Sequence, residues 1–423
     1  MKKRLGTLFL AITLAAGAIY FTSSPVRAAV NTTYDQLKLL IGVMELIQEN
    51  YVEEKDSRKL LTGAVSGMVK TLDPFSQFME PEIYKEMKTE TEGQFGGLGI
   101  RISVKENWLT VITPLPGTPA YKIGILPDDK IIKIEGKTTE GISIEDAVKK
   151  LRGNPGTKVS ITIVRDGAKE PQEFTITREI IKIETIKSKM LTSDIGYIRL
   201  SEFNASSDKD LDKALGELQS KGMKSLVFDL RNNPGGLLDT AVNVCKEFVG
   251  DNKLIVYTQG RRAESRRDYT AHGKAPYATL PMIILVNRGS ASGSEIVAGA
   301  MQDLKRSLII GTTTFGKGSV QSVFPLSEGN ALRLTTAKYY TPAGRSIHRN
   351  EETGNGGIIP DIMIDVPREI EAKLYAQSED VYAPGKEPAP PANKKEKERV
   401  EDVALERAIE LLKARSVLIT IKE

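Results

Sequence analysis

The stretch MIILVNRGSASGSEIVAGAMQD, residues 282–303, decides the fold class predicted for this chain. It begins with an apolar run that predicts a buried strand, passes through a turn of small residues, and ends in apolar residues at helical spacing. Strand and helix alternate in the same way around it, with further strands at 195–200, 225–230 and 308–310 and helices at 208–219, 237–249 and 294–303. This alternation predicts an α/β fold with a largely parallel sheet.

The segment before this core, residues 94–179, has a different character. It contains short β-rich runs, the dipeptide Asp166-Gly167 that is typical of a hairpin turn, and one helix that would begin at Ser143. These features predict a small β-rich domain.

Helical segments are predicted toward both ends of the chain. Residues 34–72 carry two amphipathic helices, and residues 402–414 carry a third, which a strand at 417–421 would follow. The stretch 381–399 is rich in Pro, Lys and Glu and is predicted to be a linker. Because these helices lie outside the two predicted domains, we expect their apolar stripes to pair protomers into a homodimer.

The N-terminus has the pattern of a secretory signal peptide. Three positive residues at 2–4 precede the uncharged run 5–26, and Val26-Arg27-Ala28 offers a small-residue cleavage site. The run is also long enough to span a bilayer, so a retained anchor is the alternative. Either outcome predicts export, to the periplasm or another extracytoplasmic location.

Composition argues against several classes of function. The net charge is +4 over 423 residues and basic and acidic residues are interspersed, so no nucleic-acid partner is indicated. The single cysteine, Cys245, leaves no intrachain disulfide, and its apolar helical context predicts a core position. With two histidines and no HExxH motif, we expect no metal site, and we expect no cofactor.

The turn Asn287–Ile296 places serines at the start of a helix. Unpaired N–H groups and the helix dipole favour a developing negative charge there, as attack by a nucleophile on a carbonyl requires. Serine also often serves as a simple helix cap. From this segment alone, capping is the more frequent role.

The loop Gly311–Ser319, with sequence GTTTFGKGS, fits most of the phosphate-loop pattern. Gly318 stands where that pattern needs Ser or Thr, and the following residues alternate as a strand rather than opening a helix. A nucleotide site is therefore disfavoured. A buried lysine can instead serve a serine as general base if its pKa falls, although an ordinary surface lysine is the simpler interpretation.

The stretch Asp229–Gly236, with sequence DLRNNPGG, ends one predicted strand and opens a helix. Its paired glycines can present backbone N–H groups to an oxyanion. A plain Gly/Pro-rich connection is about as common, and the residues alone leave both possibilities open.

Taken together, DLRNNPGGLL at 229–238, NRGSASGSEIVAGAMQD at 287–303 and GTTTFGKGSVQ at 311–321 resemble the carboxy-terminal processing peptidases, or tail-specific proteases. The resemblance extends over residues 34–350 and implies a crotonase-like α/β core. It implies that Ser292 is the nucleophile, Lys317 the general base and Gln321 the residue that orients the lysine. The oxyanion donors would be the backbone amides of Gly293 and of Gly235 and Gly236.

The β-rich segment then resembles a PDZ domain. The loop Gly97, Leu98, Gly99 and Ile100 would bind a substrate's terminal carboxylate through its N–H groups. We regard Arg152, at the end of the groove helix, as a candidate for reporting tail binding to the active site. A solvated arginine at a helix end is an equally common interpretation.

The predicted organisation is a signal or anchor at 1–29, helices at 31–92, a PDZ-like domain at 93–180, a peptidase core at 181–350 and an extension at 351–423. The predicted function is an exported serine endopeptidase that selects proteins with apolar C-terminal tails, with an activator or adaptor as a possible further partner. The alternative is an exported PDZ scaffold that binds tails without cleaving them.

Overall fold

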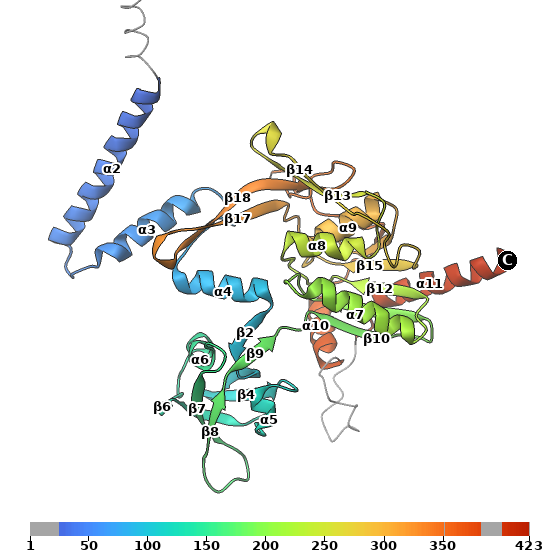
Figure 1. Cartoon of the computed structure of the whole chain (residues 1–423), viewed down its shortest axis with the longest axis horizontal. Helices are drawn as coiled ribbons and strands as arrows, with labels where there is room; N and C mark the ends of the chain where they lie inside the picture. The colour runs from blue at the N-terminus through green and yellow to red at the C-terminus, as the bar shows by residue number, and fades with distance from the viewer. Residues whose placement is uncertain (1–24, 351, 382–399, 423) are drawn as a thin grey trace, which may run out of the picture. The chain divides into compact units, whose positions relative to one another are not determined.

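The computed structural model describes residues 25–350, 352–381 and 400–422 (Figure 1). The chain divides into two compact units, Met1–Phe78 and Met79–Glu423. Most of the predicted signal segment and of the linker lies outside the described residues. Within the described part, no helix combines the length and the apolar character needed to cross a membrane.

The described part of the first unit contains two helices, as the sequence predicts. They are α2 (Pro25–Asn50) and α3 (Ser57–Lys70), and Asp56 caps the second by accepting a hydrogen bond from the N–H of Arg58. Large apolar side chains on both helices are exposed, among them Leu39 at 70% and Met68 at 64%. The short strand β1 (Gln77–Met79) spans the division between the units.

The β-rich domain follows helix α4 (Pro81–Glu92). Its sheet has the order β3-β4-β5-β7-β8, with β6 paired to β5, and a separate pair joins β2 to β9. The strands and helices are β2 (Gln94–Gly97), β3 (Ile100–Lys105), β4 (Trp108–Pro114), α5 (Pro119–Lys122), β5 (Lys130–Ile134), β6 (Lys137–Thr138), α6 (Ile144–Leu151), β7 (Lys158–Val164), β8 (Gln172–Thr177) and β9 (Glu179–Lys182). Ser143 caps α6 through the N–H of Asp146, as predicted.

The α/β core is a sheet of order β10-β11-β12-β15-β16-β19, parallel except for β10. Its strands and helices are β10 (Ile186–Met190), β11 (Ile195–Leu200), α7 (Ser207–Ser220), β12 (Ser225–Asp229), α8 (Leu238–Lys246), β15 (Met282–Val286), α9 (Gly293–Asp303), β16 (Leu308–Gly311) and β19 (Ile362–Met363). Alternate strand residues such as Ile284 and Val286 pack beneath α7, α8 and α9, which lie beside these strands in Figure 1. Cys245 is buried in this core, as expected.

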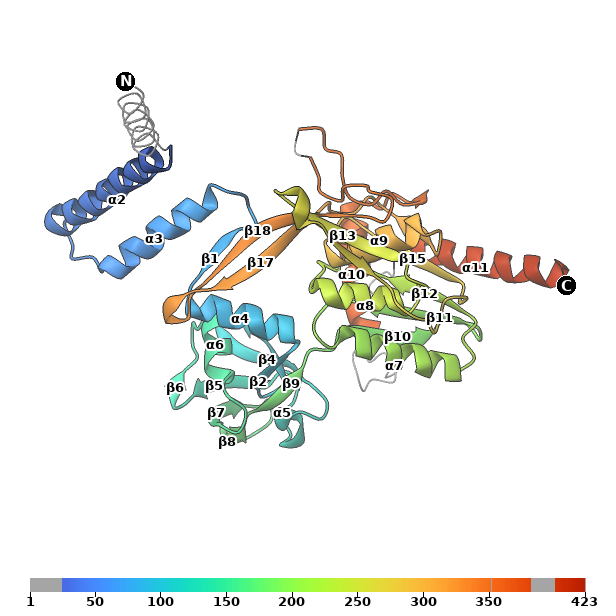
Figure 2. The same ribbon diagram turned by 45° about the horizontal axis from the view of Figure 1, so that its top comes forward.

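A second, antiparallel sheet adjoins the core, and the sequence patterns identified only one of its strands. It contains β13 (Leu254–Gly260), β14 (Arg267–Thr270), β17 (Ser319–Pro325) and β18 (Ala331–Tyr340). Figure 2 shows β17 and β18 as a long orange ribbon. Because β17 is a strand, the loop at Lys317 does not open a helix, and the phosphate-loop context is absent there.

The C-terminal helices correct two expectations. The strand predicted at 417–421 is wrong, because α11 continues as one helix (Val403–Lys422) after α10 (Arg368–Val381). The apolar stripe of α11 is also already used within the chain. Ala404, Ala408 and Leu412 are buried with Val227 and Leu285 on the sheet face opposite α7–α9. This helix therefore does not offer its stripe to a second protomer.

Candidate active site

Ser292 occupies a strained turn between β15 and α9. Its backbone has φ 51° and ψ −110°, a conformation that residues other than glycine seldom adopt and that costs about 1–3 kcal/mol. The residue is 8% exposed. A serine that serves only as a helix cap has an ordinary extended backbone, so this geometry goes beyond what capping requires.

The neighbouring serines do not cap the helix, contrary to expectation. The Ser290 hydroxyl donates to the carbonyl of Leu230 at 2.8 Å, and the Ser294 hydroxyl donates to the carbonyl of Asn233 at 2.9 Å. Both residues are fully buried. They attach the turn at Ser292 to the segment that follows β12 and so hold the two loops together.

That segment carries the glycine pair. Asn233 is buried, and its Oδ1 accepts the N–H of Gly235 at 2.8 Å, so this amide is already used. In the described part of the chain, no backbone carbonyl accepts from the N–H of Gly236 or Gly293. A Cβ on Gly235 would lie 2.7 Å from the Gly293 nitrogen, which shows how closely the two turns approach. Of the three predicted donors, Gly236 and Gly293 therefore remain available for an oxyanion.

Lys317 lies in the loop between β16 and β17, in a partly buried position. Burial lowers the pKa of its ammonium group, the nearby Arg333 guanidinium lowers it further, and Glu295 opposes both by raising it. The net direction is downward, as a lysine that acts as a base requires.

Gln321 lies on β17, which pairs with β18 in the antiparallel sheet. Its Nε2 donates to Thr335 Oγ1 at 2.9 Å and to Ser319 Oγ at 3.2 Å. Its Oε1 is buried and accepts no hydrogen bond from the residues that the structure describes. The side chain thus presents an acceptor that an ammonium group could use.

Glu295 links these parts, and the sequence patterns did not single it out. Its carboxylate is fully buried and accepts the N–H of Ser292 at 2.9 Å and that of Lys317 at 2.8 Å, both at Oε2. Oε1 accepts the N–H of Gly316 at 2.6 Å and the hydroxyl of Thr314 at 2.5 Å. Burial raises the pKa of this carboxyl above its ordinary value, and the four hydrogen bonds lower it by less.

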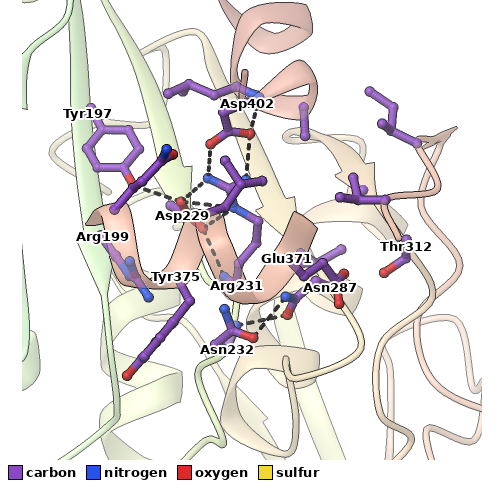
Figure 3. Close-up of a pocket in the computed structure, with 18 of the residues that line it drawn as sticks. Tyr197, Arg199, Asp229, Arg231, Asn232, Asn287, Thr312, Glu371, Tyr375 and Asp402 are labelled. Atoms are coloured by element: carbon purple, nitrogen blue, oxygen red, sulfur yellow. Dashed lines mark hydrogen bonds and ion pairs between the residues drawn. The ribbon is translucent and has the colours of Figure 1, made fainter. Parts of the chain in front are cut away.

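A partly buried ion cluster lies beside the segment that follows β12 (Figure 3). Arg231 lies between Asp229 and Asp402, at 2.7 Å from Asp229 Oδ2 and 2.8 Å from Asp402 Oδ1. The hydroxyl of Tyr197 donates to Asp229 at 2.7 Å. Burial alone would raise the pKa of Asp229, but Arg231 lowers it below the ordinary value. The start of α11 is thereby joined to the segment that carries Gly235 and Gly236.

The predicted carboxylate loop lies at the edge of the β-rich domain. Gly99 has φ 74°, and a Cβ there would lie 2.3 Å from Thr118, so glycine is required. The N–H groups of Leu98 and Gly99 donate to no backbone carbonyl among the described residues, whereas the Leu98 carbonyl accepts from Ala120. The guanidinium of Arg152 stacks 4.1 Å from the ring centroid of Phe95, which places this side chain beside the loop.

Family models match three parts of the chain. Residues 194–364 match peptidase family S41, residues 110–165 match a PDZ domain, and residues 20–83 match the N-terminal domain of the activating protease CtpB. The S41 match includes Ser292, Lys317 and Glu295, and the PDZ match includes Arg152.

Characterised relatives cover most of the chain. A carboxy-terminal-processing protease of Bartonella bacilliformis is 42% identical over 86% of this chain and 82% of its own length. Carboxy-terminal processing protease CtpA of Bacillus subtilis is 32% identical over 91% of this chain and 82% of its own length. Among solved structures, a photosystem II D1 C-terminal processing protease is 30% identical over 77% of this chain and 92% of its own, with a TM-score of 0.45.

Proposed function

Because the chain belongs to the carboxy-terminal processing serine proteases of peptidase family S41 and carries a PDZ domain, we propose that it is an exported endopeptidase that cleaves with Ser292 and Lys317. One observation carries the proposal: the backbone N–H groups of these two residues donate to the same carboxylate oxygen of Glu295. A strained, buried serine and a lysine with a lowered pKa are thus held in one cluster.

The reaction follows from this arrangement. Ser292 Oγ attacks the scissile carbonyl carbon while its proton passes to Lys317 Nζ, and the N–H groups of Gly293 and Gly236 receive the oxyanion. Collapse expels the amine, which takes the proton from Lys317, and leaves an ester on Ser292. Water then attacks the ester, Lys317 accepts the water's proton and returns it to Ser292 Oγ, and the new carboxyl terminus leaves.

Gln321 completes the catalytic site in this proposal. Its buried Oε1 is an acceptor for the ammonium group that forms when Lys317 takes the proton. Thr335 and Ser319 hold the other end of the amide, so the acceptor is kept in place. This supports a role in orienting the lysine.

In this proposal, the PDZ domain selects the substrate proteins by binding their C-terminal tails. The N–H groups around Leu98 and Gly99 would receive the terminal carboxylate of a protein tail, which would add to the sheet edge beside α6. The proposal includes the expectation from the sequence that this tail is apolar.

Export and assembly complete the proposal. The pattern at residues 1–29 supports export, with signal cleavage or a retained anchor as the two outcomes. The exposed apolar residues of α2 and α3 support pairing with a second protomer. The match of residues 20–83 to an activating protease's N-terminal domain also supports a role for this unit in contacts with another protein.

The decisive experiment is cleavage of a protein substrate with an apolar C-terminal tail by the parent and by Ser292→Ala. We expect the parent to cleave it, Ser292→Ala to leave it intact, and both to bind the tail with equal affinity, because only the covalent step needs the hydroxyl. A parent that binds tails but cleaves nothing would favour the alternative of a PDZ scaffold.

A further inference from the structure

Glu295 has no part in the chemical steps above, yet its carboxylate receives donors from both halves of the site. We propose that Glu295 is a positioning residue that locks the turn of the nucleophile and the loop of the base into one arrangement. The proposal rests on the function proposed above for Ser292 and Lys317. In this role the buried carboxylate of Glu295 holds together the segment that follows β15 and the segment that follows β16.

The contacts favour an ionised carboxylate. Three of the four partners are backbone N–H groups, which can only donate. The fourth is the hydroxyl of Thr314, whose oxygen accepts the N–H of Ile358 at 2.7 Å and whose hydrogen is directed at Glu295. Three fixed N–H donors therefore face the carboxylate, and only the Thr314 hydroxyl could turn to accept a carboxyl proton, so the ionised form fits these contacts best.

An amide cannot replace this group. Glutamine has one acceptor oxygen, and its NH2 group would face donors wherever it is placed. If the NH2 occupied the Oε2 position, it would oppose the N–H groups of Ser292 and Lys317. In the Oε1 position it would oppose the N–H of Gly316, even if Thr314 turned its hydroxyl to accept. At least one buried backbone N–H would lose its acceptor in either orientation.

The shared oxygen also determines which amide is left for the oxyanion. Because the Ser292 N–H is occupied by Glu295, the next amide, that of Gly293, is the donor that this turn presents. The strained backbone of Ser292 persists only if its surroundings hold it, and the hydrogen bond to Oε2 does so directly. Loss of Glu295 should therefore misplace the nucleophile, the base and an oxyanion donor together.

The test compares Glu295→Gln with the parent on a tailed protein substrate. We expect kcat to fall by about 100-fold, the loss that a small misplacement of reacting groups produces, while KM and tail affinity are unchanged. Modification of Ser292 by a fluorophosphonate probe should slow by a similar factor. The pH at which kcat/KM is half-maximal should move down, because Glu295 no longer raises the pKa of Lys317.

The control is Asp361→Asn, another acid-to-amide change in the same α/β domain, at an exposed residue whose carboxylate also accepts two hydrogen bonds. Asp361 accepts the N–H of Ile309 at 2.8 Å and the Gln302 amide at 3.0 Å, away from the site, and the variant should keep parental activity. If Glu295→Gln does not fold by circular dichroism, Thr314→Val removes one donor and should lower kcat several-fold with unchanged KM.

The outcomes separate the two proposals. A parent that neither cleaves substrate nor reacts with the probe overturns the proposed function. An active parent whose Glu295→Gln variant folds, keeps its kcat and keeps its pH profile overturns the positioning role alone. So does a folded Thr314→Val variant with parental kcat, if Glu295→Gln is unfolded.

Discussion

Ser292 shows at the residue scale how this site differs from the helix start that its sequence suggests. Its backbone has φ 51°, a value that glycine adopts readily and other residues seldom do. Its N–H donates to the carboxylate of Glu295, three residues further along the chain. Strain of this kind persists where the surrounding structure holds it, and it is concentrated at functional sites. The two flanking serines, in contrast, have ordinary structural hydrogen bonds to the neighbouring loop.

The first prediction concerns the chemistry of Lys317. Lys317→Arg should be as inactive as Lys317→Ala, because a guanidinium stays protonated and cannot accept the serine proton. In the parent, kcat/KM should rise as the pH rises through the lowered pKa of the lysine and then level off. Pre-steady-state kinetics across pH would measure this. An active Lys317→Arg, or a folded His272→Ala without activity, would refute the Ser–Lys mechanism.

The second prediction concerns the cost of burying this lysine. Its pKa is lower in the folded than in the unfolded chain, so the ammonium form destabilises the fold. This loss of free energy of unfolding is fully present below the pKa that Lys317 has in the folded chain. It disappears as the pH rises through the pKa of an unfolded lysine, about 10.4. Lys317→Met should therefore unfold at higher temperature than the parent at pH 7, with a difference that shrinks toward pH 10. A constant difference between the two melting curves would contradict it.

The third prediction belongs to the carboxylate loop between β2 and β3. Amidating the substrate's C-terminus should weaken binding by about 10- to 100-fold, the equivalent of losing charge-assisted hydrogen bonds of about 1.5–3 kcal/mol. Gly99→Ala should weaken binding of the free tail similarly, because its Cβ would meet Thr118. Gly156→Ala is the control, since it has a comparable φ of 85° but open space around it. Equal affinity of free and amidated tails, measured by calorimetry, would exclude carboxylate capture.

The fourth prediction concerns the end of helix α6. Arg152 stacks on Phe95 beside the carboxylate loop, so it is placed to respond when a tail binds. Arg152→Ala should lower tail-stimulated cleavage by about fivefold, matching ~1 kcal/mol for a cation–π contact, with tail affinity unchanged. Lys150→Ala, on the same helix, should have no effect. Weaker tail binding with normal turnover would make Arg152 a binding residue.

The fifth prediction concerns the whole molecule. Asp402, at the start of α11, accepts two hydrogen bonds from Arg231, which in turn binds Asp229 in the strand before the glycine pair. Asp402→Asn should lower the free energy of unfolding by about 1–3 kcal/mol, because a hydrogen-bonded charge pair is lost. Urea denaturation measures this. Glu410→Gln, which breaks an exposed pair on the same helix, should change stability little, and an equal loss there would argue against the role of Asp402.

The sequence by itself determined the class of the core and the elements between which the loops with Ser292 and Lys317 lie. Apolar runs followed by helical spacing predicted β11, β12, β15 and β16 and the helices between them, because these patterns depend on neighbouring residues. The same local patterns placed a helix start at Ser143, and the alternation after Lys317 correctly predicted a strand. The family resemblance, rather than periodicity, selected Ser292 and Lys317 among several serines and lysines.

Only the tertiary structure decided how these loops are joined. In the sequence, Glu295 is an ordinary acidic residue in the first turn of a helix, a position that the helix dipole favours in any protein. One donor, the N–H of Ser292, is local, but the other three come from a loop beyond β16, so the link between the two loops depends on long-range packing. The same holds for α11, whose apolar stripe suits a second protomer or the chain's own sheet equally well. In the structure this stripe is buried against Val227 and Leu285 of the chain's own sheet. An apolar stripe in the sequence indicates that the helix packs against some surface, but it does not identify that surface.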